Sequence, residues 1–156
     1  MTQRELYLKN NLEGMTDDGR IQFVFQKLLE NLKHGKSAIE IGNIEQKVIN
    51  INKAIEIVTF LLSILNMEGG EIAGRLKSIY LYAIDRLAKA NMTNDGKIMV
   101  EMDNIFTNLC NSWSEKMQKD KKEFNKSANI TSSSLTKDPE FGQNSEKINE
   151  RLELYG

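Results

Sequence analysis

Residues 61–91 have the sequence LLSILNMEGGEIAGRLKSIYLYAIDRLAKAN, and this segment predicts two neighbouring helices. Its first part predicts the end of one helix, and residues 66–70 predict a sharp reversal. Two adjacent glycines, Gly69 and Gly70, suit the positive φ angles and close backbone approach of a reversal. The remainder predicts one complete helix, because its apolar residues alternate between spacings of four and three. These residues are Ile72, Leu76, Ile79, Ala83, Leu87 and Ala90.

The same helical period predicts helices before and after this segment. One begins near Thr16, with Thr16 or one of the two aspartates that follow as its N-cap. The helix that ends in the quoted segment covers residues 44–67. A last helix begins at Asn94 or Asp95 and continues to about residue 125. The inner stripes of the first and last helices are Ile21, Phe25, Leu28, Leu32 and Ile39, and Ile98, Met102, Ile105, Leu109 and Trp113.

These helices indicate an all-α protein. The chain has one proline, Pro139, and no segment with a sustained period of two. Helices joined by short reversals pack as antiparallel neighbours, so we expect an antiparallel up-down four-helix bundle. The expected layout is an N-terminal arm over residues 1–15, a bundle domain over residues 16–125, and a flexible C-terminal tail over residues 126–156.

Composition narrows the classes of function. The formal net charge of −1 does not suit a nucleic-acid-binding protein. A single cysteine, Cys110, excludes an internal disulfide and fits a reducing compartment. No apolar run reaches the roughly 20 residues of a membrane span, and the first ten residues do not form a signal peptide. We therefore expect a cytosolic protein that does not insert into membranes.

The sequence does not support an active site. His34 is the only histidine, so no histidine metal set and no Cys/His dyad of plausible geometry can be assembled. Asp and Glu residues lie at helical spacings from lysines, as on solvated helix faces. The sequence contains no phosphate-binding loop and no nucleophile–base pair. We expect neither catalysis nor a bound metal or cofactor.

The predicted helix over residues 44–67 is apolar on nearly all sides. One stripe contains Ile44, Val48, Ile51, Ala54 or Ile55, Val58, Leu62 and Leu65. A turn of about 100° per residue places Ile49, Ile57, Phe60 and Ile64 on the opposite side, with Leu61 between. Such a helix is covered on both sides, so it is central in the fold, forms a homodimer contact, or lines a groove for an apolar client helix.

The quoted segment resembles the signature helix of the FliS family of flagellar secretion chaperones. The matching residues are GGEIA, Leu76, Ile79-Tyr80, Tyr82, Arg86-Leu87 and Ala90-Asn91, and a weaker resemblance extends from about Thr16 to Trp113. These proteins keep flagellin soluble and unpolymerised in the bacterial cytoplasm and deliver it to the export apparatus. The first helix departs from the family pattern, because it lacks the initial proline and the central tyrosine and Asp-Gly pair.

The resemblance implies a stoichiometric chaperone, monomeric or weakly dimeric, for the disordered C-terminal segment of flagellin. It favours the groove, with Ile49, Ile57, Phe60, Leu61 and Ile64 as the client-binding residues. It also implies that an arm containing Leu6, Tyr7, Leu8 and Leu12 covers the groove, and that Tyr7 contacts the export gate. The alternative is a helical homodimeric adaptor without a flagellin client, in which the same helix forms the dimer interface.

The C-terminal residues change in composition. From Asn125 the chain is rich in serine, threonine and asparagine and contains Pro139, which is typical of a linker. Ser145 is suited to cap a short helix whose apolar face contains Ile148, Leu152 and Tyr155. The family pattern does not include this tail, and its role stays open.

Overall fold

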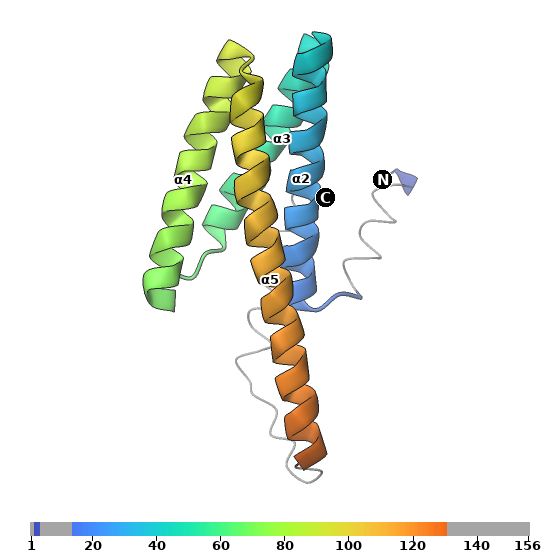
Figure 1. The fold of residues 1–156 in the computed structure, drawn as a ribbon, viewed down its shortest axis with the longest axis vertical. Helices are drawn as coiled ribbons and strands as arrows, with labels where there is room; N and C mark the ends of the chain where they lie inside the picture. The colour runs from blue at the N-terminus through green and yellow to red at the C-terminus, as the bar shows by residue number, and fades with distance from the viewer. Residues whose placement is uncertain (1, 4–13, 131–156) are drawn as a thin grey trace. The chain divides into compact units, whose positions relative to one another are not determined.

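The structure is a computed structural model that describes residues 2–3 and 14–130. Its regular elements there are all helical, which confirms the predicted all-α class (Figure 1). They are α2 (Asp17–Ile41), α3 (Ile44–Ser63), the short 3₁₀ helix η1 (Met67–Gly69), α4 (Gly70–Thr93) and α5 (Gly96–Ile130). None of these helices is by itself long and apolar enough to cross a membrane, and α3 passes that test only together with Met67–Thr93, across a bend of 72°.

The described residues fall into two compact units. Unit 1 comprises residues 2–3, 14–23 and 111–130, and unit 2 comprises residues 24–110. In unit 1 the first turns of α2 are bonded to α5. Trp113 Nε1 donates to the Asp18 carbonyl oxygen at 3.0 Å, and Gln22 Nε2 donates to Ser114 Oγ at 2.6 Å. The indole of Trp113 therefore fixes the start of α2 through a backbone group.

Side chains cap the starts of α2 and α3. Thr16 Oγ1 accepts a hydrogen bond from the Gly19 amide at 3.1 Å, so Thr16 is the cap among the predicted candidates. Asn43 Oδ1 accepts from the Gln46 amide at 3.2 Å, directly after Gly42, whose φ of 75° is in the left-handed region. Both caps satisfy amides that a helix leaves without an internal partner.

The reversal between α3 and α4 is longer than the sequence predicted. α3 ends at Ser63 instead of Met67. Asn66 Oδ1 accepts from the Glu68 amide at 3.0 Å and starts η1, because a short amide side chain competes with the helical backbone for hydrogen bonds. Gly70 then has a φ of 72°, which is the positive angle expected at one of the two glycines.

Asn94 ends α4 in the left-handed conformation. Its φ is 57°, and its amide donates to the Ala90 carbonyl oxygen at 2.9 Å. Asp95 Oδ1 then accepts from the Lys97 amide at 2.9 Å, so α5 begins at Gly96. The predicted start of this helix was therefore correct within two residues.

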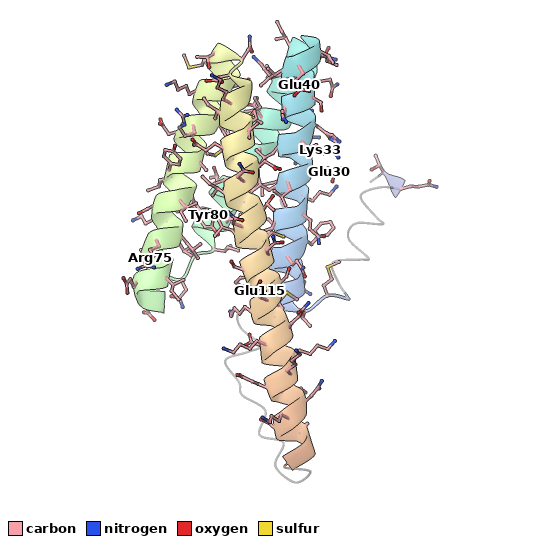
Figure 2. The ribbon with its side chains drawn as sticks, viewed as in Figure 1. Glu30, Lys33, Glu40, Arg75, Tyr80 and Glu115 are labelled. Atoms are coloured by element: carbon pink, nitrogen blue, oxygen red, sulfur yellow. The ribbon has the colours of Figure 1, made fainter. Side chains whose placement is uncertain are left out.

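The core of unit 2 receives side chains from α2, α3, α4 and α5. The largest fully buried ones within it are Leu28, Leu32, Ile51, Val58, Leu87, Ile98, Met99, Met102 and Phe106. A Cβ at Gly35 would lie 3.1 Å from Met99 Cε and 3.3 Å from Ile51 Cγ1, so α2 meets both α3 and α5 at this glycine. Tyr80 of α4 stacks on Phe106 of α5 with ring centroids 6.5 Å apart, and Figure 2 shows Tyr80 between these helices.

The predicted inner stripes need a correction on three helices. On α4, Ile72 is 70% exposed, and Ala73 and Tyr80 are buried beside the correctly predicted Ala83, Leu87 and Ala90. On α5, Phe106 and Cys110 are buried in place of Ile105 and Leu109, which are partly exposed. On α3, Ile44 and Val48 are exposed. At α4 and α5 adjacent apolar residues offer two stripes one position apart, and only contact with the neighbouring helices selects one.

Candidate functional site

The five α3 positions expected to bind a client differ in exposure. Ile49 is exposed, and Ile57 and Ile64 are partly exposed. Phe60 is only 2% exposed and Leu61 is also buried, so these two residues do not form an open surface on which a client could bind. Leu61 continues the buried stripe of Ile51, Ala54 and Val58, which explains its burial.

The exposed apolar surface of α3 lies on both sides of that buried stripe. We call Ile49, Ile57 and Ile64 the first flank. The second flank, which the sequence placed inside, contains Ile44, Val48, Ile55 and Leu62; Ile44 is 63% exposed, Val48 is exposed, and the other two are partly exposed. At about 100° per residue the four members of the second flank fall within roughly 40° of one another. α3 thus presents two apolar flanks separated by its core stripe.

Lys47 sets the orientation of the first half of α3. It is only 5% exposed, and its Nζ donates to the Asn91 carbonyl oxygen at 2.8 Å and to Asn94 Oδ1. These acceptors lie at the C-terminal end of α4, where carbonyl groups lack helical partners and a positive charge is favourable. Asn91 Nδ2 also donates to Asn52 Oδ1 at 3.1 Å. The bonds fix the rotation of α3 that leaves Ile44 and Val48 outside the core.

A second polar cluster joins α4 to α5. Tyr82 OH donates to Glu101 Oε1 at 2.6 Å, and Arg86 Nε lies 3.5 Å from the same oxygen. The Arg86 guanidinium also lies 5.9 Å from the centre of the Tyr82 ring. The hydrogen bond to Glu101 is the main cause of a raised pKa at Tyr82, so its phenol keeps its proton and remains a donor.

The two tyrosines within residues 61–91 have different surroundings. Tyr82 is exposed, whereas Tyr80 is buried against Phe106, and this burial raises the pKa of Tyr80 to about 12. Exposed charged residues mark the outer sides of the helices in Figure 2, with Arg75 on α4 and Glu30, Lys33 and Glu40 on α2. The apolar flanks of α3 therefore occur in a unit whose other helices carry charges on their outer faces.

Comparison with known proteins places the chain in a family. Residues 1–120 match the family described as flagellar protein FliS. The chain is 34% identical to the flagellar secretion chaperone FliSB of Pseudomonas aeruginosa over 118 residues, which cover 72% of this chain and 94% of the relative. The chain belongs to the FliS family. The sequence resemblance is thereby confirmed.

Two further FliS relatives show how far the likeness extends. The flagellar secretion chaperone FliS of Vibrio cholerae is 31% identical over 113 residues, covering 72% of this chain and 83% of the relative. That of Bacillus subtilis is 26% identical over 124 residues, covering 80% of this chain and 92% of the relative. The family match ends at residue 120, so the last ten residues of α5 and everything after them lie beyond it.

The FliS-type arm falls outside the described residues. Leu6, Tyr7, Leu8 and Leu12 belong to it, and their predicted contacts stay predictions. Among residues 2–3 and 14–130, no three His, Cys, Asp or Glu side chains are grouped so that they could hold a metal ion. Burial raises the pKa of the Cys110 thiol, which favours the protonated form of this side chain.

Proposed function

We propose that this chain is a flagellin export chaperone. It binds the disordered C-terminal segment of flagellin in the cytosol, prevents premature polymerisation, and delivers the subunit to the flagellar export apparatus. It acts by stoichiometric binding, without catalysis or a cofactor. The observation that carries the proposal is the pair of apolar flanks on α3, in a chain whose relatives are named flagellar secretion chaperones.

The flanks have the chemistry that an amphipathic client helix requires. Burying an exposed isoleucine or valine side chain contributes about 1.5–3 kcal/mol, and Ile44, Val48 and Ile49 are exposed in the absence of a client. An apolar helix recognises such positions through residues repeated at three- and four-residue spacings. A disordered segment that folds on these flanks loses conformational entropy, which limits its affinity and permits release.

The proposal includes an arrangement of the chain around the flanks. Residues 16–125 form one up-down four-helix bundle, α5 continues to Ile130, and a polar linker with a short C-terminal helix follows. The arm over residues 1–15 lies on the client surface in the free protein and shields apolar side chains with Leu6, Leu8 and Leu12. Tyr7 contacts the export gate when the client has displaced the arm. Phe60 and Leu61 are buried, so they contribute to the packing of α3 and not to its exposed apolar surface.

Calorimetric titration with a flagellin C-terminal peptide tests the proposal. Ile49→Glu changes the first flank and Ile44→Glu the second, and both residues are exposed, so the fold should tolerate each change. Each variant should weaken binding at least tenfold, which corresponds to about 1.4 kcal/mol. Leu81→Glu is the matched control, because Leu81 is an exposed apolar residue on α4. Unchanged affinity in both α3 variants would refute the proposed surface.

The second candidate function is a homodimeric adaptor, in which α3 flanks from two copies pack together. The exposure of Ile44, Val48 and Ile49 also favours this function, because a helix-pair interface buries the same kind of side chain. Light scattering separates the two candidates. A chaperone is a monomer, or a weak dimer that the client peptide dissociates, whereas an adaptor remains dimeric when the peptide is added.

A further inference from the structure

The last turns of α5 carry an apolar stripe that ends in an exposed aromatic ring. Phe124 is 70% exposed, and Met117, seven residues earlier, is partly exposed. A separation of seven residues places two side chains on the same side of a helix. Trp113 begins the stripe, and its ring is already held by the bond to the Asp18 carbonyl and by Lys116 Nζ, 4.6 Å from the ring centre.

This stripe continues the helical period of a core. In unit 2 the same period buries Met99, Met102, Phe106 and Cys110. In unit 1 the same period continues to Met117, which is partly exposed, and to Phe124, which is exposed. Helical stability in proteins comes mainly from packing of an apolar face. The end of α5 therefore has the pattern of a helix that packs against another segment.

We propose that residues 145–155 of the same chain cover this stripe as a short helix antiparallel to α5. Ile148 and Tyr155 are separated by seven residues, as are Met117 and Phe124, and Leu152 lies between them on the same predicted face. In an antiparallel pair Ile148 lies beside Phe124, and Tyr155 lies beside Met117. Two apolar rows of equal length are then covered together.

Charges beside the two rows support the antiparallel direction. Asp120 and Glu123 flank one side of the α5 stripe and Lys121 the other, and all three are exposed. In an antiparallel helix pair, corresponding sides of the two apolar rows meet. Arg151 then lies on the side of the two carboxylates. Opposite charges therefore meet on the side of the pair that carries Asp120, Glu123 and Arg151.

The length of the connection favours the same chain over a second copy. Residues 131–144 span roughly 45 Å when extended, and α5 from Met117 to Ile130 is only about 20 Å long. A flexible tether of this length gives an effective concentration near the millimolar range. Phe124 and residues 145–155 lie beyond the family match, which ends at residue 120.

Nuclear magnetic resonance on the full chain tests this inference. We expect helical ¹³Cα shifts across residues 146–154 and contacts between the methyl groups of Ile148 and Leu152 and the ring of Phe124. Phe124→Gln should reduce the helical shifts of the tail by more than half, and glutamine preserves the α5 helix. Leu81→Gln, a matched change at an exposed apolar residue of α4, should leave the tail signals unchanged.

A charge exchange tests the direction of the pair. Arg151→Glu should reduce the helical shifts of the tail, and adding Asp120→Lys to that variant should restore them. The inference is overturned by random-coil shifts in the wild-type tail, or by helical tail shifts that survive Phe124→Gln unchanged. It is also overturned if the contacts disappear on tenfold dilution, because that result assigns the covering segment to a second copy.

Discussion

Replacing Lys47 by methionine should destabilise the protein by about 1–3 kcal/mol. Methionine keeps the apolar stem but removes the ammonium group that donates to the Asn91 carbonyl at 2.8 Å and to Asn94 Oδ1. A buried acceptor left without a donor costs about 1–3 kcal/mol. The loss of a positive charge at the end of α4 adds roughly 0.3–1 kcal/mol. Methionine does not pay the desolvation cost of a buried ammonium group, so the total loss of stability is smaller than the sum of these two values.

Urea unfolding followed by circular dichroism measures this effect as a lower midpoint with an unchanged slope. Lys53→Met is the matched control, since Lys53 lies exposed on the same helix, and it should change stability by less than about 0.5 kcal/mol. Because the bonds orient α3, Lys47→Met should also weaken flagellin-peptide binding at temperatures where it remains folded. A Lys47→Met protein as stable as the Lys53→Met control would refute this account of Lys47.

Three further predictions concern other parts of the chain. Gly74→Ala should stabilise the protein by about 0.5–1 kcal/mol, because a Cβ there meets nothing within 4 Å. Gly35→Ala should not give this gain, because its Cβ would crowd Met99 and Ile51. Equal gains of the two variants in urea unfolding would contradict the packing at Gly35. Burial raises the pKa of Tyr80 from 10.0 to about 12. The contribution of this side chain to folding stability should therefore be fully present below pH 10 and be lost as the pH rises toward 12. The slope approaches about 1.4 kcal/mol per pH unit, and Tyr80→Phe should remove it. Deletion of residues 1–15 should leave the helicity unchanged, raise self-association in light scattering and not weaken binding of the flagellin peptide; an unfolded product would show that the arm is part of the core.

The turns were largely predictable because their chemistry is local. Thr16 caps α2 through one hydroxyl, and Gly70 has the positive φ that the paired glycines indicated. Asn94 and Asp95 end one helix and start the next at the predicted start of the last helix. The end of α3 was not predictable, because Asn66 replaces the last helical turn with η1 and nothing in the apolar period of residues 61–65 signals it.

The candidate site was predictable only in part. The sequence showed that α3 is apolar on nearly all sides, and Ile49, Ile57 and Ile64 do retain exposure. It placed Phe60 on the open side, where the structure buries it, and it placed Ile44 and Val48 in the core, where the structure exposes them. The missed signal is Lys47: a lysine within the apolar period could have indicated a buried contact with the end of another helix.

The sequence by itself determined the helices, their approximate limits and the family, since helical period, capping residues and glycine positions are properties of neighbouring residues. Tertiary structure decided which of two adjacent stripes on α4 and α5 became the core. Ile72 and Ala73 are both apolar and differ by about 100° around the helix, so propensity alone does not choose between them. The choice comes from contacts such as the stacking of Tyr80 on Phe106 and the bonds of Lys47 to the end of α4, which join residues far apart in the chain.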